Sequence, residues 1–161
     1  MATKKTFDKP AGVLDHYLFL QFNPQDQAVR QELFHQLQSW QPQTAGEYFL
    51  RGTVYLEMQR DADALADFSQ VLRLNRHNLN AYRERALLYM KRGQYRLALQ
   101  DFNHILERQP KNPKMLVYRS NCLLYQGQYQ EAMADAHRAR ELGPDLPVVQ
   151  QLLNTLDTVR E

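Results

Sequence analysis

The sequence is poor in cysteine and glycine, and it lacks any long hydrophobic run. Its single cysteine, Cys122, excludes an internal disulfide framework and a zinc site built from several cysteines. No apolar stretch approaches the roughly 18 residues that a membrane-spanning helix needs. Residues 1–5 have the basic start of a signal peptide, but the apolar region that should follow is missing. We therefore expect a cytoplasmic protein, although a chain trimmed of a targeting segment would look the same.

An excess of one charge is also missing. Lysine and arginine total 20 against 18 aspartates and glutamates, so the formal charge is only +2. That balance argues against a dedicated nucleic-acid or membrane binder, in which like charge should cluster.

Motifs for chemistry are absent as well. The chain has no glycine-rich phosphate loop, no nucleophile elbow and no dinucleotide fingerprint. None of its five histidines stands in a metal-ligand spacing. Cys122 is followed by Leu123 and Leu124, which favours a packed thiol over a nucleophile. We expect no enzyme activity, no metal and no cofactor.

What the sequence does contain is an internal repeat of 34 residues. Residues 45–78, 79–112 and 113–146 align without a gap. Each repeat has arginine at position 7, a small residue at position 8, alanine at position 20 and aspartate at position 23. These residues are Arg51, Arg85 and Arg119; Gly52, Ala86 and Ser120; Ala64, Ala98 and Ala132; and Asp67, Asp101 and Asp135.

Apolar residues at helical spacing predict two helices in each repeat. Gly93 and Gly127 end the first helix of repeats two and three, as a glycine just past a helix end does. The small residues at positions 8 and 20 allow the paired helices to approach closely. The predicted helices span residues 45–58, 61–74, 79–92, 95–108, 113–126 and 129–142.

This pattern resembles the tetratricopeptide repeat (TPR), over about two thirds of the chain. The resemblance implies an all-α fold, a right-handed superhelical solenoid of antiparallel helix pairs, because one pair cannot bury its apolar face alone. Repeat one departs from the pattern at residues 59–61, where Gln-Arg-Asp replaces Gly-Gln-Tyr. Repeat three has Leu116, Leu123 and Ala136 in place of aromatic residues.

The flanking segments should cover the ends of the repeats. Asn23 and Pro24 predict the cap and first residue of a helix over residues 24–40. Pro147 predicts the start of a capping helix over residues 147–161, with an apolar face that covers repeat three. The residues on that face are Val148, Val149, Leu152, Leu153, Leu156 and Val159.

The segment before the first repeat leaves more than one interpretation open. Residues 11–44 form an N-terminal helical segment or a degenerate repeat, and residues 1–10 are expected to be disordered. The apolar stretch 13–22 is either a short helix or an arm that docks on another subunit, which would make a homodimer through residues 11–44.

The arginine and aspartate that recur in every repeat allow two interpretations. Three arginines in register could form a ladder that binds a ligand. They could instead form ion pairs with the aspartates that recur beside them, because a buried arginine without a partner costs several kcal/mol. The matching aspartate favours the structural interpretation.

The resemblance also implies a partner-binding surface, because TPR proteins bind ligands in a concave groove lined by positions 2, 5, 9, 12 and 13. Carried over to this chain, the groove residues are Phe49, Thr53, Leu56, Asn80, Arg83, Leu87, Met90, Lys91, Lys114, Val117, Asn121, Leu124 and Tyr125. Phe49 and Thr53 stand where TPRs that grip chaperone C-termini have lysine and asparagine, so that carboxylate clamp is absent. Apolar residues bordered by Arg83, Lys91 and Lys114 predict a partner segment with acidic character.

Three functional hypotheses follow. The first is a non-catalytic adaptor or assembly factor that binds a peptide or helix of another protein. The second is a translocator-type chaperone of bacterial type III secretion, which the chain resembles in architecture: three repeats after an N-terminal helical arm. The third is a nucleic-acid-associated helical-repeat protein, which would need a continuous basic stripe that Glu57, Glu84 and Asp101 interrupt.

Overall fold

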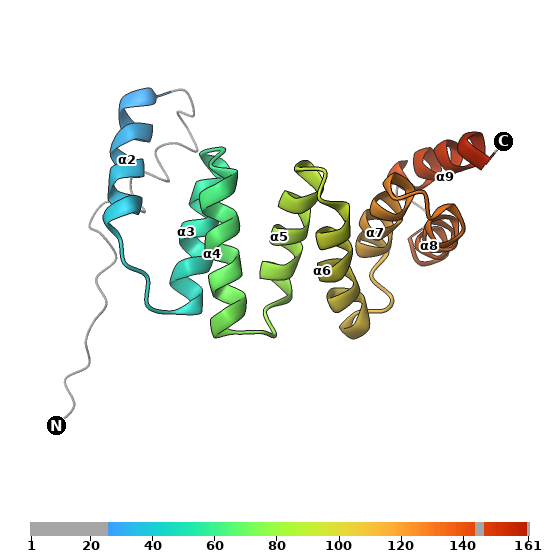
Figure 1. Cartoon of the computed structure of the whole chain (residues 1–161), viewed down its shortest axis with the longest axis horizontal. Coiled ribbons are helices and arrows are strands. Elements are labelled where there is room, and N and C mark those ends of the chain that lie inside the picture. Colours follow the sequence, from blue (N-terminus) through green and yellow to red (C-terminus); the bar gives the residue numbers. More distant parts are fainter. Residues whose placement is uncertain (1–25, 144–146, 161) are drawn as a thin grey trace. The chain divides into compact units, whose positions relative to one another are not determined.

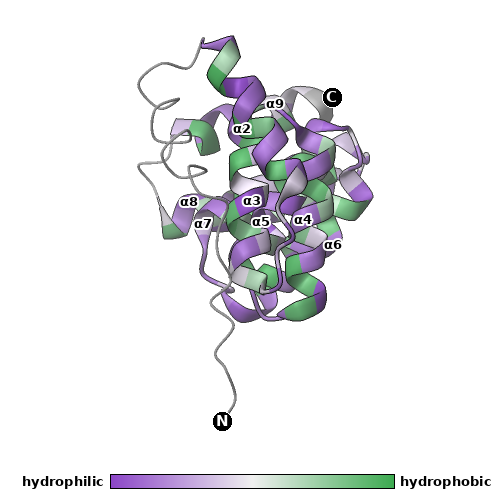
Figure 2. Ribbon diagram, turned by 90° about the vertical axis from the view of Figure 1, so that its left-hand side faces the viewer, coloured by the Kyte–Doolittle hydropathy of each residue, from purple (hydrophilic) through white to green (hydrophobic). Residues whose placement is uncertain are grey.

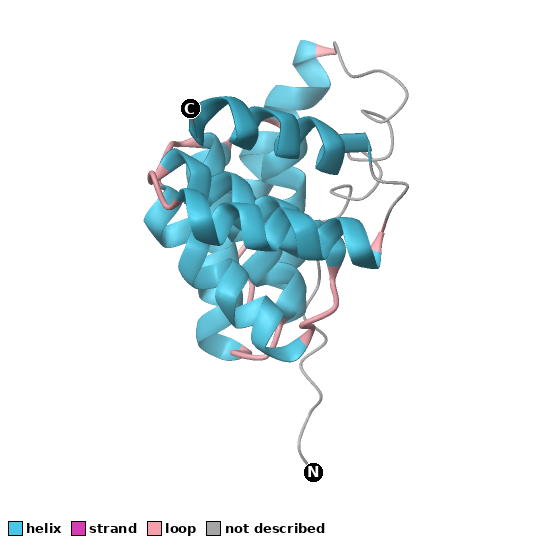
Figure 3. Cartoon of the chain, turned by 90° about the vertical axis from the view of Figure 1, so that its right-hand side faces the viewer, coloured by secondary structure: helices cyan, strands magenta, loops and turns pink. Residues whose placement is uncertain are grey.

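Every regular element in the described part of the chain is an α-helix (Figure 3). The computed structural model describes residues 26–143 and 147–160, with side chains as far as residue 158. Among these residues, no helix is both long and apolar enough to cross a membrane.

The chain divides into two compact units, residues 1–76 and residues 77–161. Unit 1 contains α2 (Gln27–Ser39), α3 (Ala45–Glu57) and α4 (Asp61–Leu74). Unit 2 contains α5 (Leu79–Lys91), α6 (Tyr95–Arg108), α7 (Pro113–Tyr125), α8 (Tyr129–Leu142) and α9 (Pro147–Arg160), as labelled in Figure 1. The helices of the three repeats lie within one residue of the predicted ranges.

The first helix of each repeat begins after a polar side chain that caps it. Thr44 and Glu47 form a reciprocal capping box at the start of α3. The Asn78 side chain accepts from a backbone N–H of α5, and Asn112 does the same for α7. Each cap satisfies a backbone donor that has no partner within the helix. The three caps are 34 residues apart, so the repeat fixes where each helix pair starts.

The turn inside each repeat uses a left-handed residue at position 15. The φ angle is 59° at Gln59, 70° at Gly93 and 74° at Gly127. Only glycine adopts this conformation without a steric cost. Repeat one therefore makes the same turn as the other repeats with a less suitable residue.

Unit 1 is held together by close approach of α3 and α4. A Cβ atom on Gly52 would lie 3.1 Å from the Phe68 ring, so the helices are nearly in contact there. Leu33 and Leu37 of α2, and Trp40 just after its end, are buried in the same unit. Figure 2 shows that the helices carry both hydrophobic and hydrophilic segments, which is typical of helices with one buried face.

The start of α2 corrects the predicted helix 24–40. Its cap is Asp26, whose carboxylate accepts the backbone N–H of Val29 at 3.1 Å, and the helix begins at Gln27. The predicted start of the helix was wrong because Asp26, three positions after Asn23, caps the first turn instead. Its carboxylate accepts an N–H that has no partner within the helix. Asn23 and Pro24 lie outside the described residues, as do the segments 1–10 and 13–22 with their predicted disorder and arm.

Unit 2 has one continuous core to which all five of its helices contribute. Consecutive helices pack against each other, and α9 packs on both α7 and α8. The buried residues of α9 are Val149, Leu152, Leu153 and Leu156. Val148 was predicted on the same face but is 46% exposed, because it lies about 100° around the helix from the buried Val149 and faces away from the core.

Candidate partner-binding surface

The repeated arginine and aspartate form two-pronged ion pairs between the two helices of each repeat. Both guanidinium nitrogens of each pair lie 2.6–2.8 Å from the carboxylate oxygens. The pairs are Arg51 with Asp67, Arg85 with Asp101, and Arg119 with Asp135. The structural interpretation of this pattern is confirmed. The ion pairs argue against a ligand-binding ladder of arginines, because each guanidinium already forms a two-pronged pair with the aspartate of its own repeat.

The aspartate partners of Arg51 and Arg85 raise the pKa values of these two arginines. The hydrogen bond with Asp67 raises the pKa of Arg51 more than burial lowers it. Burial acts to lower the pKa of Arg85, but its hydrogen bond with Asp101 and the charge of that carboxylate raise it overall. Arg51 also donates to the Trp40 carbonyl at 2.7 Å, which ties α3 to the end of α2. The three ion pairs therefore stabilise the packing of the two helices in each repeat.

Cys122 and the possible metal ligands were the candidate reactive groups of the sequence. Cys122 is fully buried, and burial raises the pKa of its thiol to about 12. A thiol with that pKa is protonated at neutral pH and is a poor nucleophile. In the described part of the chain, no group of three or more His, Cys, Asp or Glu residues could hold a metal ion.

The predicted groove residues of unit 2 lie on its first helices, α5 and α7. They include exposed polar residues, partly buried apolar residues and one exposed tyrosine, and we call the set the α5–α7 surface. Its members are Asn80, Arg83, Leu87, Met90, Lys91, Lys114, Asn121, Leu124 and Tyr125. The apolar members Leu87, Met90 and Leu124 pack on the core of unit 2 and still reach solvent. Such side chains can contact a partner while they stay packed on the core of unit 2.

Val117 does not belong to this surface. It was predicted to line the groove, but it is only 3% exposed and forms part of the buried core of unit 2. The Val117 side chain is small enough to be covered completely by the surrounding core. A partner could touch it only after the core had opened.

Two polar residues of the α5–α7 surface, Arg83 and Asn121, differ in their side-chain partners. Arg83 forms an ion pair with its neighbour Glu84, with 2.7 Å between nitrogen and oxygen. Asn121 is partly buried, and we find no hydrogen-bond partner for its side chain among the described residues. Its amide can therefore donate to and accept from a partner backbone.

The corresponding residues of unit 1 are largely engaged within that unit. The Phe49 ring packs against Phe68, with 5.4 Å between ring centroids. The Thr53 hydroxyl donates to the Phe49 carbonyl at 2.9 Å. Leu56 is partly buried on the same helix. Unit 1 therefore offers fewer open contacts at these positions than unit 2 does.

Sequence reasoning missed one residue that borders the α5–α7 surface. Tyr95, the first residue of α6, stacks on Tyr125, the last residue of α7, with 4.6 Å between centroids and 6° between ring planes. Tyr125 is 65% exposed, so its other side faces solvent. The signal was present in the sequence, because Tyr95 and Tyr129 recur at position 17 of repeats two and three.

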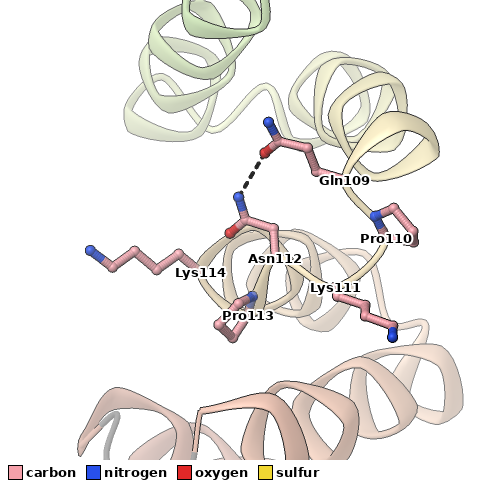
Figure 4. A pocket seen from close by; sticks show the side chains of 6 residues that line it. All are labelled: Gln109, Pro110, Lys111, Asn112, Pro113 and Lys114. Carbon is pink, nitrogen blue, oxygen red and sulfur yellow. Dashed lines mark hydrogen bonds between the residues drawn. The ribbon is translucent and has the colours of Figure 1, made fainter.

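Three hollows in the described part of unit 2 lie away from most of the α5–α7 surface. Figure 4 shows one at the α6–α7 loop, residues 109–114, where the Asn112 amide donates to the Gln109 side chain at 2.9 Å. Lys111 and Lys114 point away from each other in this view, so no charged groups converge on a ligand. Two more hollows lie between α6, α7 and α8, around Asn103 and Arg119. Of the α5–α7 surface, only Lys114 borders any of these three hollows.

Two family models described as tetratricopeptide repeat match the sequence. One covers residues 54–122 and the other residues 89–156, so together they run from α3 into α9. No curated protein matches the chain.

Solved structures of low sequence identity share the fold. MamA from Desulfovibrio magneticus RS-1 has a TM-score of 0.77 at 15% identity, covering 95% of this chain and 88% of that one. The second TPR domain of human RPAP3, in complex with HSP70 peptide SGPTIEEVD, has a TM-score of 0.65 at 18% identity, covering 70% and 94%. The Yersinia enterocolitica type III secretion chaperone SycD, in complex with a peptide of the translocator YopD, has a TM-score of 0.65 at 20% identity, covering 72% and 94%.

Proposed function

Because the chain belongs to the tetratricopeptide repeat family, we propose that it is a non-catalytic module that binds a segment of a partner protein on the α5–α7 surface. The observation that carries this proposal is the set of apolar side chains on first helices that pack on the core and remain open to solvent. Leu87, Met90 and Leu124 combine both properties. Covering such a surface with a partner is favourable, because apolar area is removed from water. The module does not have to rearrange first, so little of this free energy is lost.

The binding mechanism is burial of partner side chains with a few polar contacts that set orientation. Leu87, Met90 and Leu124 supply the apolar contact, and Tyr125 supplies a large ring at one end. The Asn121 amide supplies a hydrogen-bonding group beside them. Arg83 contributes less, because it already forms an ion pair with Glu84.

The similar structures support the general role and leave the partner open. RPAP3 and SycD were solved with peptides of other proteins, so this fold accommodates a peptide in at least two unrelated settings. The present chain lacks the carboxylate clamp at Phe49 and Thr53. We therefore propose a partner segment recognised by apolar contacts, and not a chaperone C-terminus held by that clamp.

Site-specific photo-crosslinking in source-cell lysate tests the proposal. A benzophenone amino acid replaces Asn80 or Lys114, which are exposed on first helices, and in matched controls replaces Gln100 or Arg138, which are exposed on second helices of the same unit. We expect one partner to be crosslinked from Asn80 and Lys114 and not from the controls. Crosslinks from Gln100 and Arg138 alone would move the binding site to the second helices and overturn the proposal.

The narrower hypotheses stay predictions. The likeness to SycD is a likeness of fold at 20% identity, so a role as a type III translocator chaperone rests on architecture. A homodimer through residues 11–44 is tested by deleting residues 1–22 and measuring the mass in solution, where a shift from dimer to monomer is expected. Cytoplasmic location is tested by fractionating source cells.

A further inference from the structure

The Tyr95–Tyr125 stack leaves an aromatic surface open at one end of the α5–α7 surface. The two rings are nearly parallel, and Tyr95 covers one side of Tyr125. Tyr125 nonetheless remains 65% exposed, more than any other large hydrophobic residue in the described part of the chain. A flat ring held by a stacked neighbour is already oriented for a third ring, so little conformational entropy is lost when one binds.

Positive charge is concentrated in the sequence around Tyr95. Residues 85–100 contain four cations and no acid, although the whole chain is nearly neutral. Arg85 is paired with Asp101, but Arg92 and Arg96 are exposed and have no ion-pair partner among the described residues. Arg92 precedes Tyr95 by three residues and Arg96 follows it directly. Both cations therefore border the turn that carries the stacked ring.

We propose that the Tyr95–Tyr125 stack and its two arginines are the docking point for an acidic partner segment that carries an aromatic side chain. The partner ring lies on the open face of Tyr125, and its carboxylates pair with Arg92 and Arg96. This inference rests on the proposed function and names the chemistry of the partner. It adds Tyr95, Arg92 and Arg96, which lie outside the positions implied by the family resemblance.

The extent of the charge favours a peptide over a nucleic-acid strand. A strand needs cations along its whole length, with rings at successive bases. The equivalent turn of repeat three, residues 126–130, contains no charged residue. The positive charge is local to the α5–α6 turn, which suits one ring and a few neighbouring carboxylates.

Binding of short labelled peptides to the full chain, followed by fluorescence anisotropy, tests this inference. The probes are a glutamate-rich peptide with a central tryptophan, the same peptide with leucine in its place, and a glutamine-rich peptide with the tryptophan. We expect the acidic aromatic peptide to bind about 5–10-fold more tightly than either of the other two. Tyr125→Ala should remove most of the preference for the aromatic, and Arg92→Gln with Arg96→Gln most of the preference for the acidic peptide.

Matched variants separate these effects from general damage. Tyr129→Ala removes an exposed tyrosine from α8, and Arg138→Gln removes an exposed cation from the same helix. Both should bind like the wild type, and all variants should keep their helical circular dichroism. Equal binding of the three peptides, or equal loss in the control variants, would overturn the inference.

Two further outcomes locate a failure. A thymidine oligonucleotide that binds more tightly than every peptide, and is lost in Tyr125→Ala, would replace the peptide by nucleic acid and overturn the inference. Crosslinks from Asn80 and Lys114 that survive in Tyr125→Ala, without any peptide preference, would reject the stack and leave the proposed function standing. If no partner is crosslinked from Asn80 or Lys114 in the chain that keeps Tyr125, the proposed function itself is rejected.

Discussion

Repeat one in unit 1 and repeat two in unit 2 share a backbone plan and differ at the turn between their helices. In both, the residue after the left-handed one donates its N–H to a carbonyl five residues earlier, at 2.8 Å. Repeat one makes this turn with Gln59 and repeat two with Gly93. The packing of the helix pair therefore sets the turn, and the glycine only removes its cost.

The same comparison separates scaffold from surface. Position 23 is aspartate in both repeats and forms the same ion pair, with Arg51 in one and Arg85 in the other. Position 17 is Asp61 in repeat one and Tyr95 in repeat two. Residues that hold the helix pair together are repeated, whereas residues that face solvent vary and can give each unit its own binding chemistry.

The largest expected effect comes from breaking the ion pair in unit 2. Asp101→Ala leaves Arg85 half-buried without its counter-charge, and we expect a loss of about 2–3 kcal/mol in the free energy of unfolding. Asp67→Ala should cost less, because Arg51 keeps the Trp40 carbonyl as a hydrogen-bond acceptor. Urea unfolding followed by circular dichroism measures both.

A double variant serves as the control for this prediction. Arg85→Met with Asp101→Leu replaces both charges by apolar groups and should be more stable than Asp101→Ala alone. If the double variant is the less stable of the two, the attraction between Arg85 and Asp101 stabilises the fold by more than the burial of their charges destabilises it. Equal losses in Asp67→Ala and Asp101→Ala would show that the Trp40 carbonyl adds nothing.

The fold could be predicted from the sequence because its signals repeat. Arginine, aspartate and small residues at fixed positions mark every helix pair, so an error in one repeat is corrected by the other two. The start of α2 has no such copies, and Asp26 could not be preferred over Asn23 on local rules alone. A single occurrence of a capping residue is a weak signal because several neighbours satisfy the same rule.

The candidate site was harder to predict because it depends on exposure. Position 5 gave Val117, which is buried, whereas position 17 gave Tyr95, which the family pattern does not place in the groove. Whether a side chain is covered depends on which neighbours fill the space above it. That information lies in the packing of α7, α8 and α9 and not in the repeat.

Titration of Cys122 should weaken unit 2 and leave unit 1 unchanged. Burial raises the pKa of this thiol to about 12, well above its ordinary value. The folded state therefore keeps a proton that the unfolded chain releases, so the stabilisation is complete below about pH 8.5 and is lost as the pH rises toward 12. Between pH 7 and pH 10 we expect the wild type to lose about 1–2 kcal/mol more than Cys122→Val, whose side chain does not titrate.

The two units provide the internal control for that titration. Position 10 of repeat one is Val54, which is buried and cannot ionise. Hydrogen exchange at pH 7 and pH 10 would report opening of each unit separately. A change of equal size in the amides of α3 and α7 would show that the thiol is not the group responsible.

A smaller loss is expected when repeat two is given the turn of repeat one. Gly93→Ala places a Cβ atom at a left-handed residue, and no atom lies within 4 Å to clash with it. The cost is therefore confined to the backbone, at about 1 kcal/mol. Urea unfolding measures it, and Gly127→Ala should give a similar value because that site is equally open.

The reciprocal change should stabilise repeat one, and it is the sharpest test of the comparison. Gln59→Gly removes the steric cost of φ 59°, but it also makes the unfolded chain more flexible, so the net gain should stay below about 1 kcal/mol. Gln59 is exposed, and the turn is held by the backbone bond from Arg60 to the Tyr55 carbonyl, which glycine preserves. Gln59→Ala keeps a Cβ atom at the left-handed residue and should show none of this gain, so it is the matched control. If Gln59→Gly lowers the free energy of unfolding instead, the glutamine side chain stabilises the turn by more than the left-handed backbone of Gln59 destabilises it. The turn of repeat one would then be stabilised differently from the turn of repeat two.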